Sequence, residues 1–159
     1  MFLKCDIIYP NDHTYYTQPQ PLAASVVIKA LSGKFVTKDG SGNLALSAAA
    51  DTQIHGWADV GTGDGTFTAS ATAGDTKVPI VRDLQVVFEI PNKTGQTLTE
   101  ATLKTLMFKT CDLYVDSGIQ QADTTASTTD VLVIVGGDVA KNWLYVMINP
   151  AKFYTAGVV

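Results

Sequence analysis

Short apolar runs that alternate with turn-forming residues dominate the chain from residue 25 onward. The runs are rich in Val, Ile, Phe, Leu and Thr, and Gly, Asn, Asp or Pro separate them. This pattern is typical of β-strands joined by tight turns. The run at 67–72 fits either a strand or an extended loop. The pattern predicts strands at 25–30, 34–37, 44–47, 53–60, 67–72, 77–81, 84–90, 113–116, 131–135 and 143–148.

Two turn signals are specific enough to interpret. The first is Lys-Asp-Gly-Ser-Gly-Asn at 38–43. The oxygens of Asp39, Ser41 and Asn43 would suit Ca²⁺, but no closing Glu follows them, and Asp-Gly pairs are what hairpin turns require. We therefore predict a turn there. The second signal, Gly-Gly-Asp at 136–138 followed by Lys-Asn at 141–142, predicts a hairpin between the last two apolar runs.

One segment has the pattern of a helix. Thr97-Leu98-Thr99-Glu100 fits a capping box in which Thr97 is the N-cap and Glu100 bonds back to it. Apolar residues then recur near helical spacing as far as Met107, and β-branched threonines weaken the far end. The pattern predicts one short helix that begins after Thr97.

Many short strands, Gly-rich turns and one helix predict a mainly β fold, a small β-barrel or sandwich with one short α-helix. The order of the strands cannot be deduced from this pattern. We expect a single β-rich domain over residues 23–159, preceded by an extended N-terminal arm over residues 1–22.

The predicted arm combines prolines, amides and tyrosines. Proline disfavours both helices and central strands, so extended backbone is expected. Tyrosine is enriched at protein interfaces, which indicates contact with a partner, although an arm folded back on its own domain explains the same residues. The arm residues predicted to bind a partner are Tyr9, Pro10, Tyr15, Tyr16, Pro19 and Pro21.

Composition narrows the classes of function. Hydrophobic residues make up 46% of the chain and charged residues 16%, as expected for a folded domain. The net charge is −4 and no basic run occurs, which disfavours binding to nucleic acid or to an anionic membrane. No apolar stretch has the length of a membrane helix, and no secretory signal is recognisable. We expect the chain to be made in a cytoplasm.

Candidate catalytic and metal-binding residues are few. Of the two histidines, His13 lies in the proline-rich arm, which is a poor platform for a catalytic base, and His55 has no acid or nucleophile near it in the sequence. No Gly-x-Ser-x-Gly motif is present. Cys5 and Cys111 would complete a four-ligand zinc set with the two histidines, but no short paired spacing supports one. We predict two free thiols, no catalytic residue, no cofactor and no metal.

Two further motifs are explained structurally. The glycine-rich segment at 61–66 has an Asp where a phosphate loop needs neutral or basic groups, and no Lys follows, so we predict a surface loop. A glycosidase needs two carboxylates across a cleft. The only glutamates, Glu89 and Glu100, are assigned instead to a strand's polar face and to the helix cap.

Several segments resemble the head decoration, or cement, proteins of tailed bacteriophages. The resemblance spans residues 25–150 and rests on generic turn-and-strand patterns. The segments that carry it are Ala-Leu-Ser-Gly-Lys-Phe-Val at 30–36, Leu-Ala-Leu at 44–46, Ile-His-Gly-Trp-Ala at 54–58, Lys-Thr-Cys-Asp-Leu at 109–113 and Val-Met-Ile-Asn-Pro at 146–150.

The resemblance implies a structural protein on the outer capsid surface of a virion. Its partners would be the major capsid protein and further copies of itself, with a homotrimer favoured. The arm would bridge neighbouring coat subunits by main-chain pairing. The alternative is a carbohydrate-binding or adhesin module, in which Trp57, Trp143 and the tyrosines stack on sugar rings.

Overall fold

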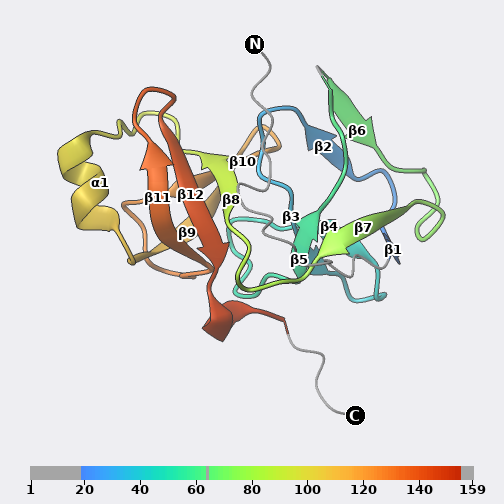
Figure 1. Ribbon diagram of the computed structural model, residues 1–159. Helices are drawn as coiled ribbons and strands as arrows, with labels where there is room; N and C mark the ends of the chain where they lie inside the picture. Colours follow the sequence, from blue (N-terminus) through green and yellow to red (C-terminus); the bar gives the residue numbers. More distant parts are fainter. Residues whose placement is uncertain (1–18, 64, 155–159) are drawn as a thin grey trace.

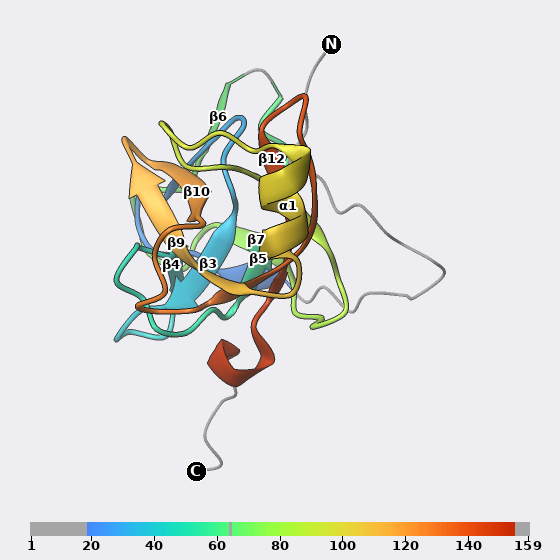
Figure 2. The same cartoon turned by 90° about the vertical axis from the view of Figure 1, so that its left-hand side faces the viewer.

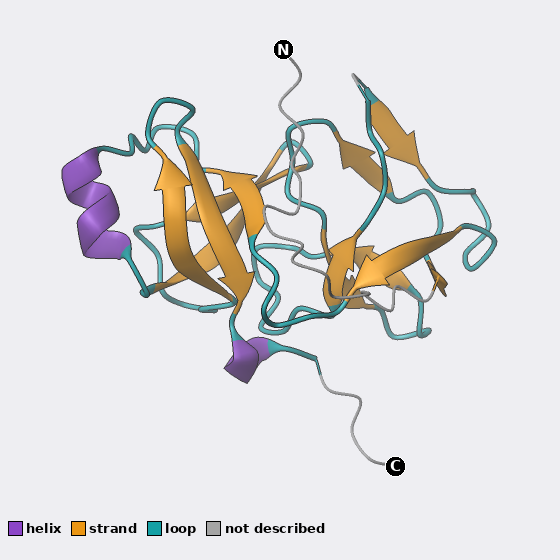
Figure 3. Cartoon of the chain, in the orientation of Figure 1, coloured by secondary structure: helices purple, strands orange, loops and turns teal. Residues whose placement is uncertain are grey.

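The computed structural model describes residues 19–63 and 65–154, which form a mainly β structure with one short α-helix (Figures 1 and 3). Its strands form two five-stranded sheets and a separate two-stranded ribbon, and neither sheet closes into a barrel. The mainly β prediction with one short helix is therefore confirmed. The strands of the first half are β1 (Pro19–Pro21), β2 (Val27–Lys29), β3 (Phe35–Lys38), β4 (Leu44–Leu46), β5 (Gly56–Ala58), β6 (Thr66–Thr68) and β7 (Lys77–Val81).

The first sheet has the antiparallel order β1-β7-β5-β3-β4. In β7, Pro79 lies opposite Pro19 of β1. Because neither proline has an amide hydrogen, the two residues that cannot donate to the ladder face each other. Beyond β1, the buried Leu22 forms a single bridge to Leu44 of β4, so the two outer strands of the sheet come together.

The ribbon of β2 and β6 is paired separately from both sheets. Its pairing continues past the strand ends, since the amide of Ala30 donates to the Gly65 carbonyl and the amide of Ala69 donates to the Val26 carbonyl. The predicted strand at 25–30 contains β2, whereas the strand alternative at 67–72 shares only residues 67–68 with β6.

The second sheet has the antiparallel order β10-β9-β11-β12-β8. Its outer strands also approach each other, through a single bridge between Asn92 and Ala122. The bounds of its strands are β8 (Phe88–Pro91), β9 (Thr110–Asp116), β10 (Ile119–Asp123), β11 (Leu132–Asp138) and β12 (Trp143–Ile148).

Strand β10 is not among the predicted strands. It pairs with β9 through the two-residue turn Ser117–Gly118. Both turn residues have positive φ, 51° and 77°, as a hairpin turn that matches strand twist requires. The strand lacked an apolar alternation because its buried positions include the amides Gln120 and Gln121.

The hairpin of β11 and β12 is confirmed. Helix α1 (Glu100–Leu106) contacts β11 and covers its outer face (Figures 1 and 2). A Cβ on Gly137 would lie only 3.0 Å from Leu98 and 3.2 Å from Leu103. Glycine at this position therefore allows the helix and the segment before it to approach the strand.

The predicted start of the helix was wrong by two residues. Thr99 is the N-cap, and it exchanges hydrogen bonds with Thr102 in a capping box, whereas Glu100 is the first helical residue. The reason lies outside the segment. Asn142 accepts a 2.7 Å hydrogen bond from the amide of Leu98, which holds Thr97 and Leu98 outside the helix.

The strand predicted at 84–90 also begins later, because Asp83 accepts a hydrogen bond from the amide of Gln85 and forms a local turn.

Two contacts join the sheets at their junction. The first is an aromatic cluster in which Trp57 stacks on Phe88 at 4.7 Å, with Phe35 edge-on to both rings. The second is the fully buried Gln120, whose side chain accepts from the Phe35 amide and donates to the Phe35 and Ser47 carbonyls. One cluster of buried apolar residues therefore spans both sheets, and a second cluster lies within the first sheet and the β2–β6 ribbon.

Candidate functional site

The structure locates two of the six arm residues predicted to bind a partner. Tyr9, Pro10, Tyr15 and Tyr16 lie outside the described residues. Pro19 and Pro21 lie in β1 and pair with β7 of the same chain. The last residues of the predicted arm therefore belong to the edge of the first sheet, with Leu22 fully buried beneath it.

Of the four residues that were considered and rejected as a zinc set, only His55 and Cys111 belong to the described part of the chain. Cys5 and His13 lie outside it, and no group of three or more His, Cys, Asp or Glu side chains within it could hold a metal ion. Cys111 is buried in β9, where burial raises the pKa of its thiol to about 12. A thiol with such a pKa is protonated at neutral pH and is a poor nucleophile.

The segment at 38–43 is a turn, as predicted. One carboxylate oxygen of Asp39 accepts hydrogen bonds from the amides of Ser41 and Asn43, each at 2.8 Å. Gly42 has a φ of 87°, which glycine adopts readily. The carboxylate thus completes the turn.

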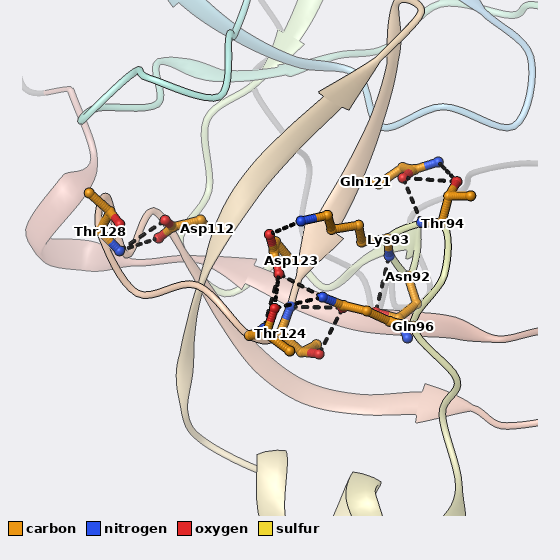
Figure 4. Close-up of polar contacts among 10 residues, drawn as sticks. Asn92, Lys93, Thr94, Gln96, Asp112, Gln121, Asp123, Thr124 and Thr128 are labelled. Carbon is orange, nitrogen blue, oxygen red and sulfur yellow. Dashed lines mark hydrogen bonds and ion pairs between the residues drawn. The ribbon is translucent and has the colours of Figure 1, made fainter.

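The densest polar cluster surrounds Asp123 at the end of β10 (Figure 4). Its carboxylate accepts hydrogen bonds from Lys93 at 2.6 Å, from Gln96 at 2.7 Å and from Thr125. The ammonium group of Lys93 also lies 4.3 Å from the centroid of the Tyr114 ring. Burial opposes ionisation, but these donors outweigh it and hold the pKa of Asp123 well below its usual range.

Asp112 of β9 likewise accepts hydrogen bonds, in this case from the neighbouring loop (Figure 4). Its carboxylate accepts hydrogen bonds from the amides of Thr128, Thr129 and Asp130. Burial raises the pKa of this group, but the three amide donors outweigh burial and lower the pKa overall. Both carboxylates are therefore ionised at neutral pH and bonded to the fold, which suits them to hold loops and not to transfer protons.

His55 lies between the two ends of the described chain. Its Nε2 is 2.9 Å from Oε1 of Gln20 in β1, and its ring centroid is 5.7 Å from that of Tyr154. Burial, then the positive charges of Arg82 and Lys38, lower the pKa of this ring to about 4. His55 is therefore neutral at pH 7.

Both tryptophans are buried, with Trp57 at the junction of the sheets and Trp143 at the start of β12. Neither presents an open ring face on which a sugar could stack.

Two large apolar side chains face solvent from unusual backbone positions. Leu31, between β2 and β3, is 48% exposed with a φ of 58°. Phe108, between α1 and β9, is 76% exposed with a φ of 62°. The sequence pattern did not indicate either residue as exposed, since Leu31 follows an apolar strand and Phe108 follows an apolar helix. Nothing in the local pattern marks a left-handed backbone at either residue.

Comparison with protein-family models, with curated proteins and with solved structures finds no match. None of the helices in the described part of the chain has the length and apolar character needed to cross a membrane.

Proposed function

We propose that the chain is a structural protein that binds other protein surfaces, as a capsid decoration protein does. It would bind the outside of a viral shell and stabilise it by bridging neighbouring subunits of the major capsid protein. The observation that carries the proposal is the exposure of Leu31 and Phe108 from left-handed backbone.

Left-handed backbone is costly for these two residue types. The left-handed conformation costs a residue with a Cβ about 1–2 kcal/mol of conformational free energy. Asn, Asp and Gly adopt this conformation most readily. The other non-glycine residues with positive φ in the described part of the chain are small or polar: Ser25, Ser117, Asp130 and Asn142. Leu31 and Phe108 carry this strain while leaving 48% and 76% of their surface exposed to solvent. Contact with a partner would supply the missing burial.

Hydrogen bonds hold the backbone at both positions. The amide of Phe108 donates to the Ile134 carbonyl at 2.7 Å, and the amide of Ile134 donates to the Lys109 carbonyl. Beside Leu31, the amide of Ala30 donates to Gly65 and the amide of Gly33 donates to Gln120. A contact residue that is already fixed loses little entropy on binding.

The charges near Phe108 indicate the chemistry of its partner. Lys104, in the last turn of α1, and Lys109 flank it in the sequence, and both are exposed. The partner surface would therefore offer an apolar pocket bordered by acidic groups. The predicted arm residues that precede β1, which are Tyr9, Pro10, Tyr15 and Tyr16, would add a second contact with the partner.

Substitution by asparagine tests the contact directly. Phe108→Asn removes the ring and suits left-handed backbone, so the variant is expected to fold at least as stably while binding at least about tenfold more weakly. The assay is sedimentation of the full chain with empty shells assembled from the major capsid protein of the same virus. Ser117→Asn is the matched control, since it changes an exposed residue of similar φ without removing apolar area. Unchanged shell affinity of Phe108→Asn would refute the proposal.

A deletion tests the arm separately. Because Pro19–Pro21 form β1, the deletion should stop at residue 18 and leave that strand intact. We expect the shortened chain to keep its melting temperature and to lose shell binding. Binding with the affinity of the full chain would contradict a clamping role for the arm.

A further inference from the structure

His55 connects the first described strand of the chain with its last described residues. Its Nε2 lies 2.9 Å from the side-chain oxygen of Gln20 in β1. On its other side, Tyr154 donates its amide to the Ile54 carbonyl, and the amide of Ile54 donates to the Lys152 carbonyl. The His55 and Tyr154 rings are in contact. One buried histidine therefore lies under both ends of the described structure.

The surroundings of the ring suit only its neutral form. His55 is 5% exposed, and its Nδ1 has no hydrogen-bond partner among the described residues. A neutral ring with its hydrogen on Nε2 satisfies the contact with Gln20. A protonated ring carries a second N–H on Nδ1, and leaving that donor unpaired in the interior is costly.

The charged groups around His55 also favour the neutral form of its ring. The guanidinium of Arg82 donates to the His55 carbonyl at 3.1 Å and to the Tyr154 carbonyl at 2.7 Å. It also lies 5.1 Å from the ring centroid of Phe153. Lys38, at the end of β3, adds a second positive charge. Both cations repel an imidazolium.

The two segments that touch His55 are also weakly held. Strand β1 is three residues long and two of them are prolines, so Gln20 alone has an amide hydrogen. The C-terminal segment forms one β-bridge, between Ile54 and Phe153, and accepts one hydrogen bond from Arg82 at the Tyr154 carbonyl. Local opening of such segments requires less free energy than unfolding of the core.

We propose that His55 is an acid-sensitive latch whose protonation drives its ring toward water and releases β1 and the Phe153–Tyr154 segment together, while the rest of the chain stays folded. The latch goes beyond the binding function proposed above and does not depend on which partner the chain has.

Hydrogen exchange of the full chain measures this release. After correction for intrinsic exchange rates, we expect the protection of peptides covering β1 and residues 152–154 to fall roughly ten- to thirtyfold between about pH 7.5 and about pH 5. Peptides from β11 and β12 should keep their protection over the same interval. Equal loss in all peptides, or no loss at the two ends, would overturn the latch.

Two variants identify the group that titrates. His55→Gln keeps a donor for Gln20 but cannot take up a proton, so the acid response of both segments should disappear. His13→Gln, which removes the only other histidine, should leave the response intact. A response that persists in His55→Gln refutes the latch. If that variant does not fold, NMR titration of the wild-type His55 ring decides, since the latch requires this ring to titrate well below the ordinary histidine pKa of about 6.5.

Discussion

Gln120 shows how a polar side chain can join two sheets from inside the core. Its amide group bonds both the amide and the carbonyl of Phe35 and also the Ser47 carbonyl, while its backbone amide bonds Ser32. These partners lie 73 to 88 residues away, so no local pattern indicates them. Asp39, in contrast, was correctly assigned to a turn because its partners lie two and four residues ahead.

At this scale we predict that Gln120→Ala destabilises the chain by about 3 kcal/mol or more, because it leaves buried groups of Phe35 and Ser47 without partners. Urea unfolding followed by Trp fluorescence measures the change. Gln85→Ala is the matched control, since that side chain is exposed and the substitution should change the free energy of unfolding by less than about 0.5 kcal/mol. A loss no larger than the control's would show that the Gln120 hydrogen bonds add nothing.

A single helix or strand could be predicted where the residues within it determine its secondary structure. The runs at 77–81 and 143–148 became β7 and β12 with the same bounds, because continuous apolar and β-branched residues favour strands. Strand β10 was missed because its buried face carries amides, although the Ser-Gly pair at 117–118 was a usable turn signal. The helix start was misplaced because Asn142, distant in sequence, binds the Leu98 amide.

The helix cap gives a prediction that separates the two assignments of the N-terminus. Thr99→Ala removes the side chain that accepts from the Thr102 amide, and should lower the free energy of unfolding by about 1 kcal/mol. Thr97→Ala should have almost no effect, since Thr97 is exposed and lies before the cap. Thermal unfolding followed by circular dichroism measures both. The opposite ranking of the two variants would restore Thr97 as the N-cap.

Across the whole molecule, the sheet order and the exposed positions of Leu31 and Phe108 were beyond prediction from sequence. The order depends on pairings between distant segments, such as β8 with β12. The exposure of Phe108 depends on a backbone angle fixed by its bond to Ile134 of β11. A pattern of apolar and polar residues contains neither kind of information.

We expect the free energy of unfolding to fall in two steps as the pH is lowered. The folded pKa of His55 is lowered, so the stability linked to it is complete above the ordinary pKa of about 6.5 and is lost as the pH falls toward about 4. The folded pKa values of Asp112 and Asp123 are also lowered, so the stability linked to them is complete above about pH 4 and is lost below it.

Urea unfolding over a pH series should show both steps, each on the order of 1–3 kcal/mol. Asp123→Asn should destabilise the chain at neutral pH and reduce the lower step, because an amide cannot form an ion pair with Lys93. Asp59→Asn, at an exposed position, is the control and should change neither step. A lower step of full size in Asp123→Asn would exclude this carboxylate as its source.

The facing prolines of β1 and β7 have a consequence for crowded solutions. Successive amides of an antiparallel strand point to opposite sides, and the amide of Leu22 points toward Thr76, just before β7. The amide of Gln20 has the same direction, so the outward positions of this border strand are Pro19 and Pro21. This edge strand therefore offers no outward N–H group to a neighbouring molecule. It resists the strand-by-strand stacking from which fibrils grow.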